Sequence, residues 1–304
     1  MRHLFILNPA AGKRGTTRQL EGLLDRLRVP HEVVYTGGAG DAERFAREAA
    51  AAGAPVRIYA CGGDGTLNEV VNGAAGYENA AVTNVPKGTG NDFLKIFGPD
   101  YRKIFYDLEA LAQGPQTAFD LIDCNGRLGI DVVCAGVDAR IAADVHRYKD
   151  WPLVTGKGAY VLALLENIFL KGISRSMSVQ MGDKRWENAP ACLLCVCSGR
   201  YYGGGFMPVG DAMPDDGVLD MLRVRQISLW TFLRLVGQYA KGRYREYPEL
   251  IDHYHGQRVE FSALEPITVV VDGEVMRDTR FTVRLSEKKI NFFYPAGADY
   301  RVKD

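Results

Sequence analysis

Residues 56–69 read VRIYACGGDGTLNE, in which an apolar run passes directly into three glycines around one aspartate. The run from Val56 to Cys61 has the length and apolar character of a buried β-strand. Three glycines at its end would be costly for stability alone, because glycine loses more backbone entropy on ordering than any other residue. They are expected where a ligand must lie against the main chain, and Asp64 could there hold Mg²⁺ on a phosphate group. The stretch therefore predicts a nucleotide site at the end of a strand.

Strands and helices alternate on both sides of this stretch. Apolar runs predict strands at 3–8, 31–35, 56–61 and 80–85, and leucine or alanine spacing predicts helices around 20–27, 41–52 and 67–75. This alternation indicates a mostly parallel sheet with helices on both faces. In such sheets ligands bind at the carboxyl ends of the strands, so the loops after the first, third and fourth strands are the candidates.

Two of these loops resemble the one at Asp64 in composition. Residues 86–93, PKGTGNDF, combine glycines, a hydroxyl and a carboxylate, and could form the other side of one crevice. Residues 8–15, NPAAGKRG, suit a phosphate through exposed N–H groups near a helix start, with an ordinary polar loop as an equal alternative. The chain has no G-x-x-x-x-G-K-[ST] loop, no G-x-G-x-x-G helix start and no protein-kinase signature set. The predicted phosphate site is therefore of another type.

The pattern changes near residue 118. Asn125-Gly126 predicts a hairpin between strands at 119–124 and 127–134. Further strands are predicted at 175–181, 191–197, 218–224, 257–262, 266–272 and 280–285, with one long helix at 156–171. This half is expected to be antiparallel β-structure with one or two helices, which divides the chain into domains at 1–120 and 121–304.

The second half contains two candidate sites. Asp272-Gly273-Glu274 follows an apolar strand; it is either a tight turn or, where Glu274 faces the phosphate crevice, a base for a substrate hydroxyl. Asp215, Asp216 and Asp220 could hold a hard cation together with backbone carbonyls, and a hairpin turn is the alternative. A third cluster, Cys192, Cys195 and Cys197, lies among apolar residues, which favours a buried strand over a metal site.

The bulk composition narrows the class of protein. The 304 residues are 47% hydrophobic and 24% charged, with formal net charge zero, which argues against a general nucleic-acid binder. The apolar run near the N-terminus is too short for a signal peptide, and no stretch approaches the length of a spanning helix. A cytoplasmic protein is predicted.

The loops together resemble the diacylglycerol-kinase catalytic-domain family, which includes bacterial lipid kinases and, more distantly, sphingosine and ceramide kinases. The resemblance rests on Asn8-Pro9 with Gly12, on GGDGT at 62–66, on GTGNDF at 88–93, on DDGVL at 215–219 and on DGE at 272–274, in this order along essentially the whole chain. GGDGT alone would not suffice, because NAD kinases carry it too. Departures are Ala11, where relatives commonly have serine, and Lys87, where the usual residue is apolar or small.

The resemblance implies a Rossmann-like N-terminal α/β domain, a C-terminal antiparallel β-sandwich and an active site in the cleft between them. It implies that the last residues, about 288–304, return to the N-terminal domain. The implied catalytic residues are Glu274 as general base, Asp64 as the organiser of the catalytic Mg²⁺ and Asp92 in its support. The implied ATP contacts are Asn8, Gly12, Thr36, Gly63, Asp64, Gly65, Thr66, Leu67, Asn68, Glu69 and Thr89. A separate structural Mg²⁺ is implied at Asp216 and the carbonyls of Met213 and Val218.

The function expected from these residues is transfer of the γ-phosphate of ATP to a hydroxyl of a diacylglycerol-like membrane lipid. The alternatives are a kinase of a soluble acceptor, of the NAD-kinase or sugar-kinase type, and a non-catalytic lipid-binding regulatory protein. A lipid kinase would meet the inner membrane face as a peripheral protein, and relatives suggest a homodimer. Residues 160–171 are apolar almost all round and predict either a core helix or a wall of the acyl pocket. The basic residues 241–245 could contact anionic headgroups or be a solvated helix end.

Overall fold

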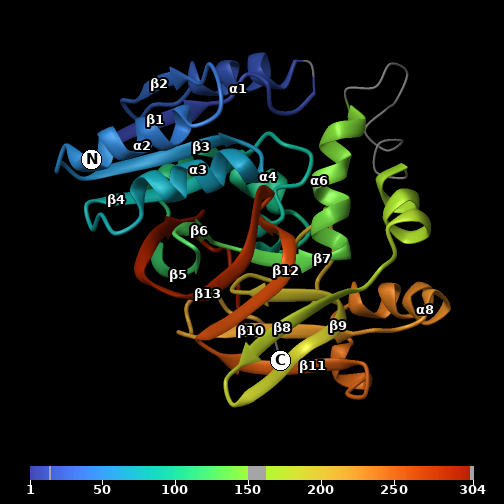
Figure 1. Cartoon of the computed structure of the whole chain (residues 1–304). Helices are drawn as coiled ribbons and strands as arrows, with labels where there is room; N and C mark the ends of the chain where they lie inside the picture. The colour runs from blue at the N-terminus through green and yellow to red at the C-terminus, as the bar shows by residue number, and fades with distance from the viewer. Residues whose placement is uncertain (14, 150–161, 302–304) are drawn as a thin grey trace.

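The computed structural model describes residues 1–13, 15–149 and 162–301. The N-terminal part of the chain is an α/β domain (Figure 1). Four parallel strands lie side by side in the order β4-β3-β1-β2. In chain order the elements are β1 (Arg2–Leu7), α1 (Thr16–Leu24), β2 (Glu32–Tyr35), α2 (Asp41–Ala51), β3 (Val56–Gly62), α3 (Asp64–Ala74) and β4 (Ala80–Pro86). The predicted alternation of strands and helices is confirmed: the apolar runs of β1, β3 and β4 are buried strands of this sheet, and β2 is its partly exposed outer strand.

Helices α2 and α3 pack closely against each other. A Cβ added to Gly73 of α3 would lie 2.3 Å from the carbonyl oxygen of Glu43 in α2, so only glycine fits at this contact. Three short helical segments then lead out of the domain: η1 (Phe93–Phe97), α4 (Tyr101–Phe105) and α5 (Leu108–Gln113). Asp107 caps α5 by accepting a hydrogen bond from the N–H of Ala110.

The C-terminal part is a β-sandwich-like domain of mostly long antiparallel strands. Its elements are β5 (Gln116–Cys124), β6 (Arg127–Gly129), β7 (Val132–Gly136), α6 (Val137–Lys149), η2 (Glu166–Leu170), β8 (Arg175–Met181), β9 (Lys184–Cys197), β10 (Leu219–Arg225), α8 (Leu229–Tyr239), η3 (Tyr244–Glu246), β11 (Ile251–Gly256), β12 (Arg258–Val271) and β13 (Glu274–Phe293). The predicted Asn125-Gly126 hairpin is confirmed between β5 and β6, with both residues at positive φ.

Strand β13 joins the two parts of the chain. It pairs with β12 and β5 for most of its length, and near its end Asn291 and Phe292 pair in parallel with Ala81 and Val82 of β4. The same strand therefore begins at Glu274 and ends inside the sheet of the N-terminal domain. This pairing with β4 fixes the position of β13 relative to the parallel sheet of the N-terminal domain.

Several predicted elements differ from those observed. The strand predicted at 127–134 is two strands, because the carboxylate of Asp272 accepts hydrogen bonds from the main-chain N–H groups of Ile130, Asp131 and Val132 and bends the chain there. The strands predicted at 257–262 and 266–272 are one strand, β12, with a register shift between Ser262 and Ile267.

The helices of the second half were underpredicted. Helix α6 follows β7 directly and was not predicted at all. Of the helix predicted at 156–171, residues 156–161 lie outside the described residues, whereas 162–165 are α-helical and pass into the π-helix η2. Within the described residues no helix is both long and apolar enough to cross a bilayer.

Alternate residues of the C-terminal strands face two different hydrophobic clusters, as the two-residue period of a strand requires. In β9, Leu194 and Val196 face one cluster, and Cys195 and Cys197 face the other. All six cysteines are buried and free, which agrees with the buried-strand prediction for the cysteine-rich segment.

Candidate active site

The loops after β1, β3 and β4 meet at the carboxyl edge of the parallel sheet. The side-chain amide of Asn8 donates to the hydroxyl of Thr66 at 3.1 Å. The ammonium group of Lys87 donates to the main-chain oxygen of Asn8 at 2.7 Å, and the N–H of Lys87 donates to Gly62 O at 3.0 Å. The three loops predicted from the sequence therefore form one continuous surface. Lys87, a departure from the family pattern, ties two of them together.

The glycines in these loops are required by contacts between the loops. A Cβ on Gly12 would lie 2.3 Å from the carbonyl oxygen of Lys87, and a Cβ on Gly88 would lie 2.4 Å from the Cα of Gly63. A Cβ on Gly90 would lie 2.5 Å from a carboxylate oxygen of Asp64. The sequence predicts these glycines as positions where a ligand approaches the main chain. In the structure they also allow the backbone of one loop to approach the backbone of another.

Asp64 lies in the first turn of α3, where its side chain joins two loops. Its two carboxylate oxygens accept hydrogen bonds from the N–H groups of Asn91 at 2.8 Å and Asp92 at 2.6 Å. Burial, with a smaller contribution from the nearby Asp92 carboxylate, raises the pKa of Asp64 to about 6. The carboxylate thus carries its charge at an energetic cost that a cation would relieve.

Asp92 connects the loop after β4 to the C-terminal domain. One of its oxygens accepts from the N–H of Gly204 at 2.8 Å, and the other is paired with the ammonium group of Lys95. Gly204 belongs to the glycine run 203–205 of the sequence. The predicted supporting carboxylate is therefore brought to Asp64, and it also holds the two domains together.

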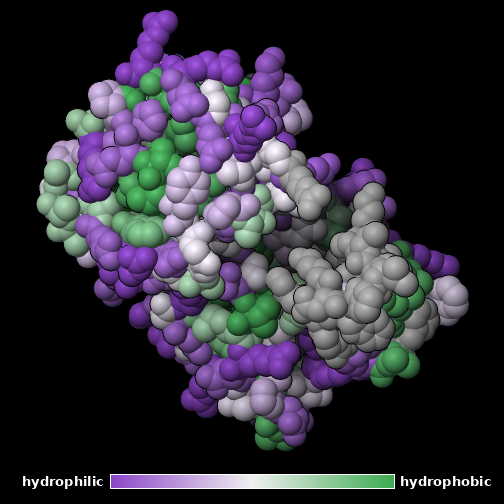
Figure 2. Space-filling view, turned by 90° about the horizontal axis from the view of Figure 1, so that it is seen from above, coloured by the Kyte–Doolittle hydropathy of each residue, from purple (hydrophilic) through white to green (hydrophobic). Residues whose placement is uncertain are grey.

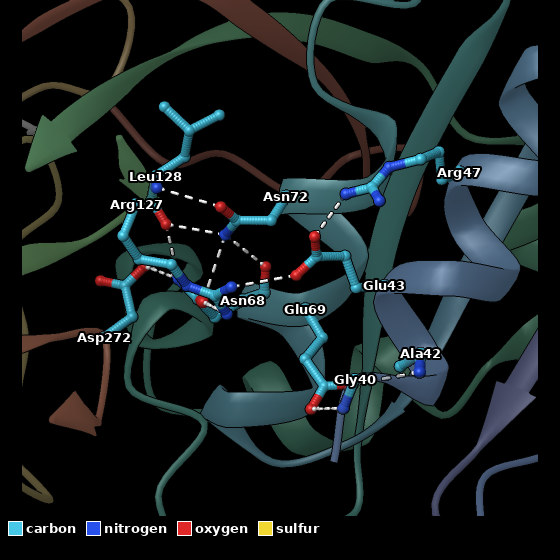
Figure 3. A network of polar contacts seen from close by, with 10 residues as sticks. All are labelled: Gly40, Ala42, Glu43, Arg47, Asn68, Glu69, Asn72, Arg127, Leu128 and Asp272. Atoms are coloured by element: carbon cyan, nitrogen blue, oxygen red, sulfur yellow. Dashed lines mark hydrogen bonds and ion pairs between the residues drawn. The ribbon is translucent and has the colours of Figure 1, made fainter. Parts of the chain in front are cut away.

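Asp272 is the centre of a second interdomain contact (Figure 3). Besides the three N–H groups between β6 and β7, it accepts a hydrogen bond from the side-chain amide of Asn68 in α3 at 3.2 Å. Asp272 and Gly273 both have positive φ, so the motif does form a turn, and the base role of Glu274 stays a prediction. The four donors show that Asp272 positions the turn from which Glu274 projects.

The network around Asn68 continues into α2 and β6. Arg127 bonds to Asn68 and to Glu43, and Asn72 donates to the carbonyl of Leu128 at 2.9 Å (Figure 3). Glu69 accepts from the N–H groups of Gly40 and Ala42 ahead of and within α2. The side chains of Asn68 and Glu69, which the resemblance assigned to the nucleotide, are thus engaged with the protein. A nucleotide contact for them stays a prediction.

The remaining predicted residues lie around the same edge. Glu274 is exposed and approaches the start of α3, where a Cβ on Gly65 would lie 3.3 Å from its carboxylate oxygen. Thr89 is exposed at the tip of its loop, and Leu67 is buried in the first turns of α3. Thr36 is buried at the end of β2, where its N–H bonds to the carbonyl of Leu7 at 3.0 Å.

The predicted structural metal site is centred on Asp216, and metal binding there stays a prediction. Asp216 accepts from the N–H of Val218 at 3.1 Å, and burial raises the pKa of its carboxyl group. Asp120 accepts from Gly217 at 2.8 Å and pairs with Lys289. Among the described residues no three or more His, Cys, Asp or Glu side chains converge as metal ligands. An ion here would need the main-chain carbonyls that the resemblance implies.

The sequence pattern did not indicate two further carboxyl groups of this region, those of the buried Asp131 and the half-buried Asp138. Asp131 is buried with one carboxyl oxygen that lacks a hydrogen-bond partner among the described residues, and burial followed by Asp272, Asp92 and Asp64 raises its pKa well above the usual range. Asp138 accepts from the hydroxyl of Tyr202 at 3.0 Å, and burial raises its pKa to about 6. A cation near Asp64 fits this concentration of carboxyl groups, because it would offset their mutual repulsion.

A cavity of about 400 Å³ extends from these carboxyl groups into the C-terminal domain. Asp64, Asp92 and Asp272 line one end. The rest is lined mainly by aliphatic and aromatic side chains of β9, α6, the residues before and within η2, and α8, such as Leu193, Ile141, Ile168 and Phe232. In the described part of the segment predicted as a core helix or a wall of the acyl pocket, Ala163 is buried in the core and Leu164 lines the cavity. That this cavity holds acyl chains stays a prediction.

Arg102 is a positioning residue that no sequence motif indicated. Its guanidinium group donates to the carbonyls of Pro86, Gly88, Thr89 and Gly90 at 2.9–3.2 Å, so one side chain holds the whole loop after β4. The residue follows Tyr101 at the start of α4, where the sequence pattern is that of any surface helix.

We expect Arg102→Lys to raise the KM for ATP about tenfold and to lower kcat less, because lysine cannot reproduce the planar set of donors and about 1.4 kcal/mol corresponds to a factor of ten. Added guanidinium should restore part of the ATP affinity of Arg102→Ala. Steady-state kinetics against ATP would measure both effects, with Lys103→Met on the exposed neighbour as control. An unchanged KM would show that the loop needs no such support.

The structure is that of a two-domain protein in which three glycine-containing loops lie beside a mainly apolar cavity. Comparisons of the sequence with known families also divide the chain into two parts. The family pattern described as "Diacylglycerol kinase catalytic domain" matches residues 2–124, and that described as "YegS C-terminal NAD kinase beta sandwich-like domain" matches 131–293. The chain belongs to the diacylglycerol kinase catalytic domain family, with a YegS-type C-terminal domain. Kinases of this family use ATP.

Individual relatives support the same family. The chain is 31% identical over 264 residues to "Probable lipid kinase YegS-like" of Pseudomonas aeruginosa, covering 85% of this chain and 83% of the relative. It is 26% identical over 276 residues to "Diacylglycerol kinase" of Bacillus subtilis, covering 89% and 88%. A diacylglycerol kinase crystal structure from Bacillus anthracis superposes with a TM-score of 0.70 at 19% identity, covering 98% of both chains, which shows the shared fold.

Proposed function

We propose that this protein is an ATP- and Mg²⁺-dependent lipid kinase that transfers the γ-phosphoryl group of ATP to a hydroxyl group of a diacylglycerol-like lipid. The observation that supports this best is the apolar cavity that ends at Asp64 and Asp92. A soluble sugar or nucleotide acceptor would have few polar partners along such a wall. A lipid would place its hydrocarbon there and its hydroxyl at the carboxylates.

In the proposed reaction the acceptor oxygen attacks the γ-phosphorus of ATP, the bond to the β-phosphate bridging oxygen breaks, and ADP leaves. Glu274 takes the proton of the acceptor hydroxyl as its oxygen attacks. Asp64 and Asp92 would hold Mg²⁺, which supplies charge neutralisation on the phosphates when bound. The loops after β1, β3 and β4 hold the phosphates through main-chain N–H groups. Burial of the acyl chains keeps the acceptor in place and water out.

The remaining parts of the proposal follow from the resemblance. The structural Mg²⁺ at Asp216, Met213 and Val218, the homodimer and the location at the inner membrane face are predictions on this basis. The structural ion can be sought in the purified protein by metal analysis, comparing the wild type with Asp216→Asn.

The direct test is transfer of ³²P from [γ-³²P]ATP with Mg²⁺ to a panel of lipids in mixed micelles, with NAD and sugars as soluble acceptors. Label in a lipid, absent from the Glu274→Gln variant, is the expected result. Label confined to a soluble acceptor would overturn the lipid assignment. Measurable ATP binding with no label in a broad lipid panel would favour a regulatory protein.

The cavity gives a separate prediction for acyl-chain length. Ala142 of α6 lines the cavity, and Ala142→Phe should displace part of a long acyl chain. Each methylene group kept in water costs about 0.8 kcal/mol, so a loss of two groups lowers kcat/KM for a long-chain lipid roughly tenfold.

The KM for ATP and the activity on a short-chain acceptor should change little in the same variant. Ala143→Phe, at the next position of α6 and outside the cavity lining, is the matched control. Equal effects of both variants on all acceptors would indicate a disturbed helix, and the cavity would then have no role in acceptor binding.

A further inference from the structure

Helix α8 and the segment that ends in η2 expose large hydrophobic side chains on the outer surface. Trp230 and Leu233 of α8 are 75% and 48% exposed, and Leu165 and Leu170 beside and within η2 are 45% and 83% exposed. We call these four residues the apolar rim. In Figure 2 hydrophobic side chains flank the grey residues at the right of the view, on the side where Figure 1 shows α8. A soluble monomer seldom clusters such residues without a partner.

The apolar rim is continuous with the cavity of the candidate active site. Leu233 belongs to both, since it lines the cavity and is about half exposed. The same two segments contribute Leu164, Ile168 and Val236 to the cavity wall. The cavity wall and the apolar rim are therefore formed by the same two segments.

The charges around the rim are basic. From Gln226 to Arg245 the chain has four basic residues and no acidic one. Arg243 and Arg245 pair with Glu246 and Asp211. Arg234 is exposed on α8 itself. On the other segment, the one acidic residue of η2, Glu166, is paired with Lys171 at 3.1 Å. Among the described residues, Arg234 on this face has no ion pair with an acidic side chain, and an apolar helix face with such a cation beside it is the pattern of helices that lie in the interface of an anionic bilayer.

A second copy of the chain fits this surface less well. In a two-fold symmetric contact through α8 the same patch meets itself, so Arg234 and its basic neighbours would approach their own copies. Such a contact would also cover the apolar exit of the cavity. An anionic lipid surface complements the charge and leaves the exit open to hydrocarbon.

We propose that α8 and η2 form the face that docks on a bilayer containing anionic lipid, and that the acceptor enters the cavity between them. This inference rests on the proposed lipid-kinase function and names the partner of the same site. Trp230, Leu165 and Leu170 enter the headgroup and acyl boundary, while Arg234 remains at the level of the phosphates. The acceptor hydroxyl then reaches Asp64 from within the protein, and the acyl chains need never be exposed to water.

The test is sedimentation of the full-length protein with vesicles of phosphatidylcholine and phosphatidylglycerol in a 70:30 mixture, and with phosphatidylcholine alone. We expect binding to the anionic vesicles that weakens with salt. The double variant Trp230→Gln/Leu170→Gln should bind at least tenfold more weakly, and Arg234→Gln should lose most of the preference for anionic vesicles. The matched control is Leu264→Gln, because Leu264 is 93% exposed on β12 and lies outside both helices and the cavity lining.

Melting curves establish that each variant is folded, and light scattering reports its oligomeric state. Unchanged vesicle binding in the double variant would overturn the docking face, as would a loss of binding equal to that of Leu264→Gln. A dimer that dissociates in the double variant would assign the rim to a subunit interface and also overturn the proposal.

Activity distinguishes the two proposals. The double variant should phosphorylate a water-soluble short-chain diacylglycerol at the wild-type rate and a vesicle-embedded long-chain one more than tenfold more slowly. Rim-dependent vesicle binding without phosphorylation of any lipid would refute the proposed function and leave the docking face supported. Phosphorylation of vesicle lipid at equal rates by both proteins would refute the docking face alone.

Discussion

Asp64→Asn is expected to lower kcat at least 1,000-fold while the protein remains folded, a loss of roughly 4 kcal/mol in transition-state stabilisation. The amide has nearly the shape of the carboxylate but no negative charge. It can still accept one of the two hydrogen bonds that the N–H groups of Asn91 and Asp92 donate to Asp64. The proposed Mg²⁺ would lose the carboxylate nearest the start of α3.

The fold should survive because the change has opposing effects on stability. Losing one acceptor for a buried N–H group costs about 1–3 kcal/mol, and removing a buried charge that is near Asp92 offsets part of this cost. Circular dichroism and a melting curve would check the fold, and radiolabel transfer would check turnover. Asp183→Asn, at an exposed position between β8 and β9, is the control. Activity within tenfold of the wild type would remove Asp64 from the proposed metal site.

Glu274→Gln is the second variant with a large expected effect. General-base catalysis typically contributes about 10²–10⁴-fold, so kcat should fall by this factor. ATP affinity should be nearly unchanged, because the exposed Glu274 lies at the start of β13 and the turn before it is held by Asp272. The fold should change little, because the Glu274 side chain is exposed and Asp272 holds the turn.

The measurement is kcat and KM against both substrates, together with ATP binding by calorimetry. Glu265→Gln, an exposed glutamate on the β12 bulge, is the matched control. A parallel loss of turnover and ATP affinity would indicate that Glu274 contributes to nucleotide binding, and the base would have to be another group.

The first half of the fold could be predicted closely because its signals are local. Strands β1, β3 and β4 are buried on both faces, so they are short, mainly apolar runs. β3 ends at Gly62, β4 ends at Pro86, and Asn8-Pro9 follows β1. Ligand loops in such sheets gather at the carboxyl ends of the strands. The convergence of the three loops therefore followed from the pattern.

The second half was harder to predict because its strands depend on distant partners. The division of 127–134 into β6 and β7 is imposed by the carboxylate of Asp272, far along the sequence. The register shift that keeps β12 continuous depends on its pairing with β13. Helix α6 begins directly after Gly136, the last residue of β7, and this single glycine at positive φ was not interpreted as the end of a strand.

The sequence by itself determined the chemical groups of the candidate site: glycine loops, a hydroxyl and the carboxylates of Asp64, Asp92 and Glu274. It also determined that the loops carrying these groups in the first domain follow parallel strands, whose carboxyl ends lie at one edge of the sheet. Only the tertiary structure decided what each acidic group is placed to do. Asp272 and Glu274 are two residues apart. Four hydrogen-bond donors from other parts of the chain surround the carboxylate of Asp272, and none of these four donors bonds to Glu274. Hydrogen-bond partners come from long-range folding, and this is why neighbouring carboxylates with equal chemistry have different surroundings.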